Sequence, residues 1–396
     1  MDSERPTVHV WDCAAGQPRR LGTVGAESSD YADAGWRRMQ RTPAVTWHPD
    51  QPLLLVSGEN GLVQWTRAGF SEPEGLPATA RYRNLAFSPD GRTLWASPSS
   101  GDEEDAWERS DVLDLASGTV STGPSWDTGI AEHPAGGLVA TLFSNQGATL
   151  GLFARVDDDT RPAAMRVLRR ALILDADGYR TPIFSPDGRH LAIRGNAYGN
   201  TPNVFEFPSL HCVLTTALGD PYPGHPCPPE WLEQMRAWSR HNIAFGAQPG
   251  VLWVGTPTGT LIEVDLHSQR AVEHDVLAGS PVTALTALTA TTTGHLLVAG
   301  GGGELALLSL RADSLRPDSA TARTLDADGS RAAVASFLAA TSEVPDVGDL
   351  ETHLVVTDGT RTWERDDLES TTTATATDPS WLQLQAAVNT ARAQDE

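Results

Sequence analysis

The sequence contains no lysine: its 29 basic residues are all arginine, and they face 51 acidic residues, which gives a formal charge of −22. A chain this acidic is repelled by phosphate backbones and by anionic lipid. We therefore expect no broad binding to nucleic acid or to a membrane surface. A local arginine cluster can still bind an anion. The lack of lysine in an Ala-, Arg- and Gly-rich chain is typical of a high-GC genome, and we expect a bacterial source.

Long apolar runs and a cysteine framework are also lacking. No apolar stretch reaches the roughly 20 residues of a membrane helix, and the first residues, MDSERPTVHV, lack the pattern of a signal peptide. The three cysteines are an odd number, Cys13, Cys212 and Cys227. They do not resemble a disulfide framework, so we expect a protein of the reducing cytoplasm.

What the sequence has is a repeat. LAFSPDGRTLWAS at Leu85–Ser97 and PIFSPDGRHLAIR at Pro182–Arg194 each place a Pro-Asp-Gly turn between two apolar stretches. Proline fixes φ and glycine supplies a positive φ, so the flanking stretches are predicted to form hairpins. The related segments LDADGYRTPIFS and LDADGSRAAVAS, at Leu174–Ser185 and Leu325–Ser336, support the same register.

Weaker copies of the pattern strand, turn, strand, turn, strand extend over most of the chain. With the two copies above they make seven, about 40 to 60 residues apart, near the spacing of four-stranded blades. The weaker copies are Ala44–Trp65, Gly129–Phe153, Asn242–Asp265, Pro281–Leu310 and Ala332–Glu364.

The FSPDG turns, VHVWD at Val8–Asp12 and VQW at Val63–Trp65 resemble the WD-repeat β-propeller family. The resemblance implies an all-β, seven-bladed propeller of four-stranded antiparallel blades. VHVWD stands before the first full repeat, so it is expected to close the last blade. We expect a single propeller domain over residues 1–369, followed by a polar linker and a C-terminal helix over 370–396.

Two segments break the strand pattern. Within an insertion at about 221–242, prolines 228 and 229 favour a helix start, and one face of that helix carries Trp231, Leu232, Met235 and Trp238. This helix either plugs the channel mouth or offers its tryptophans to a partner. Near the C-terminus, Asp378 and Pro379 predict the start of a helix whose apolar face carries Trp381, Leu384 and Val388.

Aligning the repeats on their first strands brings aromatic and arginine residues to one position. In a WD-like propeller this connection opens onto the rim that usually binds partners, and such residues are enriched in interface hot spots. The alternative is that the arginines pair with acidic loops as exposed salt bridges. The predicted rim consists of Tyr82, Arg83, Trp126, Asp127, Tyr179, Arg180, Arg240, His241 and Arg331.

Catalytic and metal motifs are weak. There is no Gly-x-Ser-x-Gly elbow, and Gly300–Gly303 lacks the lysine of a phosphate loop. His211, Cys212, His225 and Cys227 have suitable residue types for zinc but not a standard spacing. The DxDG sequences at Asp175–Gly178 and Asp326–Gly329 lack the further ligands of a calcium loop. We therefore expect no enzyme, no metal and no cofactor.

These observations favour a non-catalytic scaffold that binds a protein or peptide partner at one rim of the propeller. We expect the partner to be acidic where it contacts the arginines. The alternative is a ligand-sensing or catalytic propeller with a small molecule in its central channel. Convergent polar side chains with shifted pKa values would favour that alternative. The sequence leaves the oligomeric state open.

Overall fold

The computed structural model describes the chain in fourteen stretches. They are residues 8–13, 17–24, 43–58, 61–76, 82–99, 109–145, 148–157, 159–175, 179–195, 200–224, 226–288, 295–309, 327–345 and 350–395. The chain divides into two compact units. Unit 1 comprises residues 1–130 and 156–166, and unit 2 comprises residues 131–155 and 167–396.

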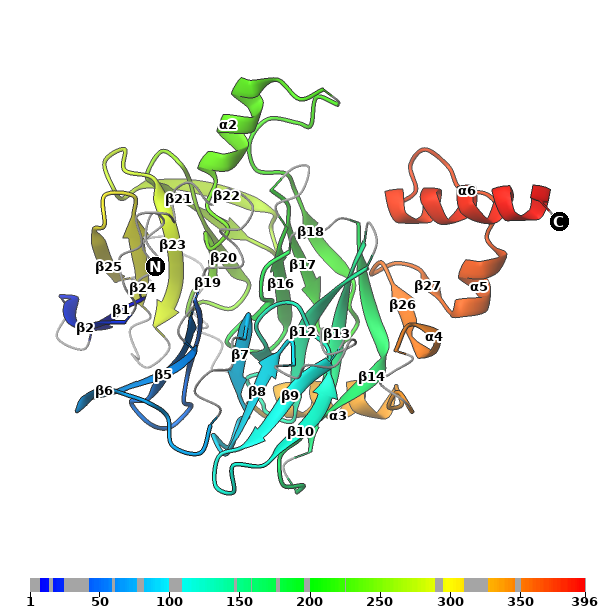
Figure 1. Cartoon of the computed structure of the whole chain (residues 1–396). Helices are drawn as coiled ribbons and strands as arrows, with labels where there is room; N and C mark the ends of the chain where they lie inside the picture. The colour runs from blue at the N-terminus through cyan, green and yellow to red at the C-terminus, as the bar shows by residue number, and fades with distance from the viewer. Residues whose placement is uncertain are drawn as a thin grey trace. The chain divides into compact units, whose positions relative to one another are not determined.

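In the described part of unit 1 there are two four-stranded antiparallel sheets and a hairpin (Figure 1). The first sheet is formed by β3 (Ala44–Trp47), β4 (Leu54–Gly58), β5 (Gly61–Thr66) and β6 (Gly69–Ser71). The second is formed by β7 (Asn84–Phe87), β8 (Thr93–Ser97), β9 (Arg109–Asp114) and β10 (Val120–Pro124). The hairpin is formed by β1 (Val8–Asp12) and β2 (Arg19–Val24).

The described residues of unit 2 form four sheets, and the first strands of successive sheets contact one another. One begins with β11 (Ala131–Glu132), β12 (Leu138–Asn145), β13 (Ala148–Asp157) and β14 (Ala164–Leu174). The next has β15 (Ile183–Phe184), β16 (His190–Arg194), β17 (Pro202–Glu206) and β18 (Cys212–Thr215). The third has β19 (Ile243–Phe245), β20 (Val251–Gly255), β21 (Thr260–Asp265) and β22 (Arg270–Asp275). The last has β23 (Val282–Leu288), β24 (His295–Gly300) and β25 (Leu305–Ser309).

The fold is a β-propeller with six blades among the described residues, so the expectation of seven is wrong. The predicted seventh repeat, Ala332–Glu364, does not form a blade. It contains most of helix α3 (Ala327–Ala339), then α4 (Leu350–His353), and two short strands, β26 (Val355–Thr357) and β27 (Thr362–Trp363). These strands extend the sheet of β14 instead, because β26 pairs in parallel with β14.

Helix α3 forms where the sequence LDADGSRAAVAS predicted a strand. The related segment LDADGYRTPIFS contains Pro182 and leads into β15, and proline opposes a helix interior. In α3 the corresponding positions are alanine-rich, which favours a helix. Its buried residues Ser330, Val334 and Phe337 are spaced four and three apart, as on one helical face.

The expected closing strand is also corrected. Within the described residues, VHVWD forms β1 and pairs with β2, with Val8 opposite Val24 and Asp12 opposite Arg19. The hairpin packs on the blade that follows it, because Val8, Val10 and Val24 share a buried cluster with residues of β4 and β5.

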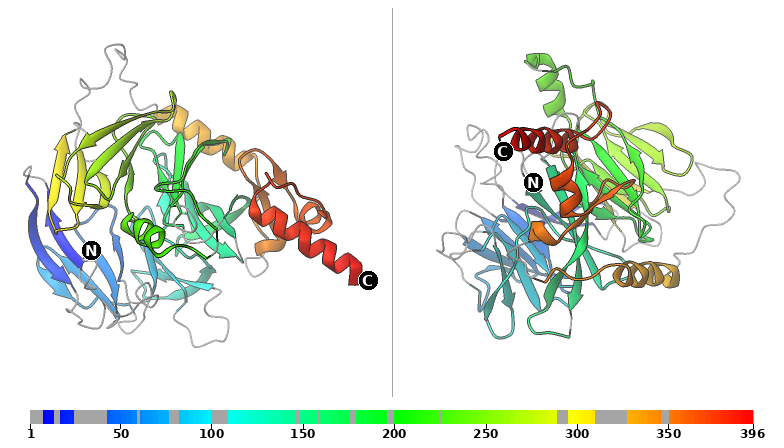
Figure 2. Two further views of the ribbon diagram at one scale, coloured as in Figure 1. Left: turned by 90° about the horizontal axis from the view of Figure 1, so that it is seen from above. Right: turned by 90° about the vertical axis from the view of Figure 1, so that its right-hand side faces the viewer.

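Two helices follow β27: α5 (Arg365–Ser370) and α6 (Ser380–Asp395). Helix α6 begins after Pro379 as expected, and Trp381 is buried against Trp363, with ring centroids 5.0 Å apart. The rest of the expected face is wrong: Leu384 is 56% exposed and Val388 38%, while Leu382 and Ala386 are buried. Helix α6 lies apart from α3 in both further views (Figure 2). No helix within the described stretches is long and apolar enough to span a membrane.

The Ser-Pro-Asp-Gly turns have the same hydrogen-bond network in both strong repeats. The hydroxyl of Ser185 donates to Asp187 Oδ1 at 2.6 Å and accepts from the His190 amide at 2.9 Å. Ser88 makes the equivalent bonds to Asp90 and Thr93, at 2.6 and 3.0 Å. This network satisfies turn amides that a side chain of another type would leave unpaired.

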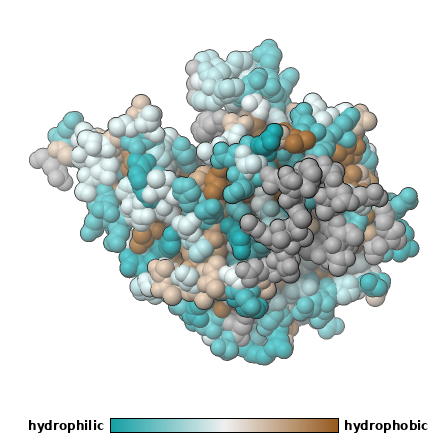
Figure 3. All heavy atoms as spheres, turned by 180° about the vertical axis from the view of Figure 1, so that it is seen from behind, coloured by the Kyte–Doolittle hydropathy of each residue, from teal (hydrophilic) through white to brown (hydrophobic). Residues whose placement is uncertain are grey.

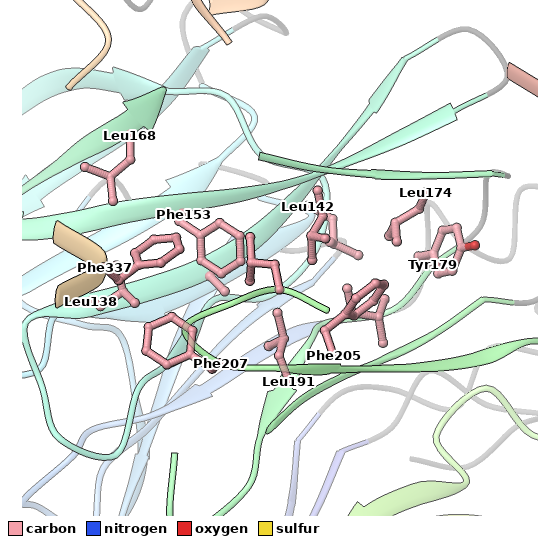
Figure 4. Close-up of a cluster of buried hydrophobic side chains, with 14 of the residues drawn as sticks. Leu138, Leu142, Phe153, Leu168, Leu174, Tyr179, Leu191, Phe205, Phe207 and Phe337 are labelled. Atoms are coloured by element: carbon pink, nitrogen blue, oxygen red, sulfur yellow. The ribbon is translucent and has the colours of Figure 1, made fainter. Parts of the chain in front are cut away.

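The largest buried cluster of unit 2 joins two blades to α3. Phe153 of β13, Phe207 after β17 and Phe337 of α3 lie close together (Figure 4), and both of the other rings are 5.0 Å from Phe337. Leu138 and Leu191 belong to the same cluster. Helix α3 therefore occupies a core position in unit 2.

His133 begins the weaker turn HPAGG and is fully buried. Its Nδ1 accepts a hydrogen bond from the Ala135 amide at 3.2 Å, so the proton is assigned to Nε2, which donates to the Gly188 carbonyl at 3.0 Å. Burial lowers the pKa of His133 below 6.5, although Gly188 and Asp187 oppose this shift. The folded protein thus holds His133 neutral.

A pH dependence of stability follows. Below pH 6.5 the unfolded chain takes up a proton at His133 that the folded chain binds less readily, so the free energy of unfolding should fall as the pH drops from 6.5 to 5. His133→Asn should be less stable than the wild type at pH 8 but should lose less stability on acidification. Guanidinium unfolding at pH 8, 6.5 and 5 measures both effects, and equal acid losses in the two proteins would contradict the assignment.

Candidate functional site

Four basic side chains of unit 2 gather at the starts of β15 and β19 and the end of β16. Arg180 precedes β15, Arg194 ends β16, and Arg240 and His241 precede β19. The Arg180 amide donates to the Arg194 carbonyl at 2.9 Å, which fixes the two arginines on neighbouring backbones. We call these four residues the arginine cluster.

Arg194 anchors the cluster and is only 1% exposed. Its Nε donates to Asn242 Oδ1 at 3.0 Å, and its Nη2 donates to Asn200 Oδ1 at 2.9 Å. Further bonds go to the carbonyls of Gly195 and Ser239. Every one of these acceptors is neutral, so within the described residues no carboxylate balances this buried charge.

The two asparagines are themselves held in place. Asn242 Nδ2 donates to the Gly255 carbonyl at 2.7 Å, and Asn200 Nδ2 donates to the Met235 carbonyl at 3.0 Å. Arg194 is thereby connected to the blade of β20 and to the helical insertion. This network makes Arg194 a fixed positive charge rather than a mobile one.

Burial and mutual repulsion lower the pKa values of the arginine cluster. Burial, followed by the charge of Arg240, lowers the pKa of Arg180 to about 10. Burial, Arg240 and Arg180 lower the pKa of Arg194 to about 10 as well. Burial of the ring and the charges of Arg180 and Arg240 lower the pKa of His241, although the residue as a whole is exposed, and this direction favours neutral His241 at pH 7. The charges of Arg180, Arg194 and Arg240 therefore lie close enough to act on one another at neutral pH.

Arg180 carries an unused donor. Its Nε is buried and has no hydrogen-bond acceptor in the described stretches, and no carboxylate there forms a salt bridge with Arg180. A buried donor without an acceptor is costly and calls for an explanation. An anion at this point would accept from Arg180 and reduce the repulsion between the arginines.

The tyrosine and tryptophan residues of the predicted rim are buried and not exposed on the surface. Tyr82 is 4% exposed, Trp126 1% and Tyr179 8%. The Tyr82 hydroxyl donates to Asp111 Oδ2 at 2.8 Å, and the Tyr179 hydroxyl accepts from Asn203 Nδ2 at 3.4 Å. These rings support the blades, so they do not offer a hot-spot surface.

The remaining rim residues lie in three different places. Arg83 and Asp127 are exposed in unit 1, and the Arg83 amide bonds the Ser97 carbonyl as the Arg180 amide bonds that of Arg194. Arg331 lies on α3 and pairs with Asp328. The alignment that placed Arg331 before a strand is wrong. Arg180, Arg240 and His241 come together in unit 2, and Arg83 and Trp126 meet at Ser97 in unit 1.

The expected helix at 228–240 is α2 (Pro229–Ala237), with proline at its first position. Met235 is buried, and Trp238 packs against the cluster that contains Leu218. Trp231 is half-buried, with Nε1 donating to the Asp220 carbonyl at 3.2 Å, and Leu232 is also half-buried. The α2 segment, which protrudes at the top, is mainly hydrophilic in the view from behind (Figure 3). One side of α2 is therefore seated on unit 2, and the choice between a plug and a recruiting helix stays open.

The metal hypotheses find no support in the described stretches, where no group of three or more His, Cys, Asp or Glu side chains could hold an ion. His211 Nδ1 lies 3.3 Å from the Gly359 carbonyl, and Cys212 is half-buried on β18. His225 lies outside the described residues, as do Asp326 and residues 176–178 of the two DxDG sequences.

Sequence reasoning missed Arg194, Asn200 and Asn242. Arg194 ends the apolar strand HLAIR, and an arginine at such an end normally reaches solvent. The sequence signal that could have identified Arg194 is that it directly follows three apolar residues of one strand, all of which are buried. The asparagines lie in connections, where such residues usually serve turns.

No family model matches the chain. The curated proteins that it matches include the voltage-dependent P/Q-type calcium channel subunit alpha-1A of Mus musculus, 30% identical over 98 residues, and that of Rattus norvegicus, 29% identical over 100 residues. Each match covers 24% of this chain and spans only 4% of the channel subunit. These matches assign no family.

Among solved structures, the chain is similar to hydrazine synthase of Kuenenia stuttgartiensis, with a TM-score of 0.50 and 14% identity. That similarity covers 74% of this chain and 87% of the other. A chain of a mitotic checkpoint complex matches with a TM-score of 0.45 and 16% identity, over 67% of this chain and 75% of that one. At such identities the likeness concerns the fold alone.

Proposed function

We propose that the protein is a non-catalytic interaction scaffold that binds an acidic segment of a protein partner at the arginine cluster. The observation that carries the proposal is that Arg180 and Arg194 lie together within the field of Arg240, and that a buried Arg180 donor has no acceptor within the described residues. The WD-repeat assignment and the cytoplasmic location are parts of this proposal that rest on the sequence alone.

The chemistry of the arginine cluster favours a carboxylate. Arginine presents paired N–H donors that match the two oxygens of a carboxylate. Arg194 is held by its neutral acceptors, so it contributes charge, and Arg180 contributes a buried donor without an acceptor in the described residues. The formal charge of −22 repels acidic peptides from the rest of the chain, so any binding of such a peptide must come from a local site.

A small carboxylate ligand is the second candidate, and the shifted pKa values favour it. Convergent ionisable groups whose pKa values are moved by burial and by one another mark ligand sites as well as interfaces. Both candidate ligands, the acidic protein segment and the small molecule, would bind through a carboxylate. The experiment must therefore distinguish a peptide carboxylate from a free one.

The test is calorimetric titration of the wild type with a hexaglutamate peptide and with free malonate. Arg180→Ala combined with Arg240→Ala should weaken peptide binding at least ~tenfold, because charge-assisted hydrogen bonds contribute about 1.5–3 kcal/mol each. Arg83→Ala is the matched control, since Arg83 occupies the equivalent position in unit 1, and it should leave affinity within about twofold.

The outcomes separate the candidates. Malonate that binds as tightly as the peptide supports the small-ligand candidate, whereas tighter peptide binding supports the scaffold. No saturable binding of either compound at about 1 mM, or equal losses in the double variant and in Arg83→Ala, would refute both. Melting temperatures of all variants confirm that the fold is retained.

A further inference from the structure

A row of large apolar side chains crosses the first blade of unit 1. Trp47 lies opposite Leu54, Leu54 opposite Trp65, and Trp65 opposite Phe70 in the antiparallel register of β3 to β6. Directly opposite residues of an antiparallel sheet point to the same face. The four side chains therefore form one continuous band across that face.

The hairpin of β1 and β2 covers only the middle of this band. Val8 and Val10 pack with Leu54 and Trp65, which are 2% and 5% exposed. A side chain at Gly22 of β2 would lie 3.1 Å from both Trp65 and Phe70, so the hairpin sits directly on the band.

The two ends of the band remain in solvent. Trp47 is 51% exposed and Phe70 43%, and Leu21 of the hairpin beside them is 42% exposed. Single exposed apolar residues are ordinary, but three large ones gathered at one place mark a binding surface.

These exposed residues line one cavity of about 540 Å³. Its walls include the rings of Trp11, Trp47, Trp65 and Phe70, and the volume lies within the range of small-molecule sites. Trp47 stands edge-on to Trp65, with ring centroids 5.8 Å apart and planes 85° apart. Because Trp47 and Phe70 are both exposed, the two ends of the band offer apolar surface to an aromatic or aliphatic body.

The charges of the cavity are unbalanced. Arg19 pairs with Asp12 at 3.6 Å. Arg67 stands in the turn between β5 and β6 and also lines the cavity. Within the described residues, Arg67 has neither an ion pair nor a side-chain hydrogen bond. The cavity thus combines an aromatic wall with one guanidinium that is free to bind an anion.

We propose that this cavity binds a small hydrophobic carboxylate. Its apolar body lies against Trp47 and Phe70, and its carboxylate pairs with Arg67. The site belongs to unit 1 and is independent of the arginine cluster in unit 2. A neutral ligand of the same shape would gain the aromatic contacts but not the charge-assisted hydrogen bonds.

The experiment compares 2-naphthoate with 2-naphthamide, which have the same ring system and differ in charge. Binding is followed by quenching of tryptophan fluorescence and by calorimetry. Arg67→Gln should weaken naphthoate binding about tenfold and leave naphthamide binding within about twofold. Trp47→Ala should weaken the binding of both compounds at least about fivefold, because it removes the wall that both contact.

Val45→Ala is the matched control, since Val45 is an exposed apolar residue of the same strand that does not line the cavity. It should change neither affinity by more than about twofold. The proposal is overturned if neither compound binds saturably at about 1 mM, if Arg67→Gln affects both compounds equally, or if Val45→Ala matches Trp47→Ala. Unfolding curves of each variant confirm that a lost affinity does not reflect a lost fold.

Discussion

Replacing Gly188 by alanine is expected to lower the free energy of unfolding by about 3 kcal/mol. Gly188 ends the second Ser-Pro-Asp-Gly turn with φ of 68°, which an alanine adopts only at a cost. An added Cβ would also lie 2.5 Å from His133 Cε1 and 2.7 Å from Ser330 Oγ. His133 cannot easily withdraw, because its ring is packed against Phe184 and Phe207.

Gly250→Ala is the control for backbone conformation alone. Gly250 has φ of 72°, but nothing lies within 4 Å of its added Cβ. Its loss should be close to ~1 kcal/mol, the cost of the left-handed conformation. Urea unfolding of both variants separates the two terms, and equal losses would show that the contact of Gly188 with His133 is not tight.

The second large effect is expected at α3. Phe337→Ala should cost about 3–5 kcal/mol, because a buried aromatic ring leaves a cavity that its neighbours fill incompletely. Phe337 is 1% exposed, contacts Phe153 and Phe207, and lies under the guanidinium of Arg170 at 5.3 Å.

Ser336→Ala is the control on the same helix, since Ser336 is exposed, and it should stay within about 0.5 kcal/mol of the wild type. Similar losses in the two variants would therefore argue against α3 as a core element of unit 2.

The blades could be predicted where turn chemistry is explicit. The Ser-Pro-Asp-Gly turns at Ser88 and Ser185 supply both the φ values and the side-chain acceptors of a hairpin, so sequence and structure agree there. The segment at residues 332–364 has a similar apolar content without such a turn. Alanine-rich composition and the partners Phe153 and Phe207 favour a helix there. Packing partners so distant in the chain are not visible in the sequence.

The candidate sites show the same limit. Alignment of the repeats identified Arg180, Arg240 and His241, because they occupy equivalent or adjacent positions before strands. It also included Tyr82 and Trp126, since an aromatic residue before a strand gives no sign of its burial. The apolar band from Trp47 to Phe70 could not be predicted, because it depends on how four strands are paired in register. The alternation of apolar and polar residues in each strand does not determine that register.

The C-terminal segments have a consequence for how copies of the chain can meet. Strand β14 is 11 residues long, and such an outer strand is a template for adding strands of another molecule. Here the amide of Val344 bonds the Val167 carbonyl, that of Arg169 bonds the Ser342 carbonyl, and β26 pairs with Arg170 to Leu172. The outer strand of the sheet is therefore β27, which has only two residues, in place of the long β14. The part of the sequence that departs from the blade pattern thus guards this sheet against intermolecular strand exchange and fibril-like growth.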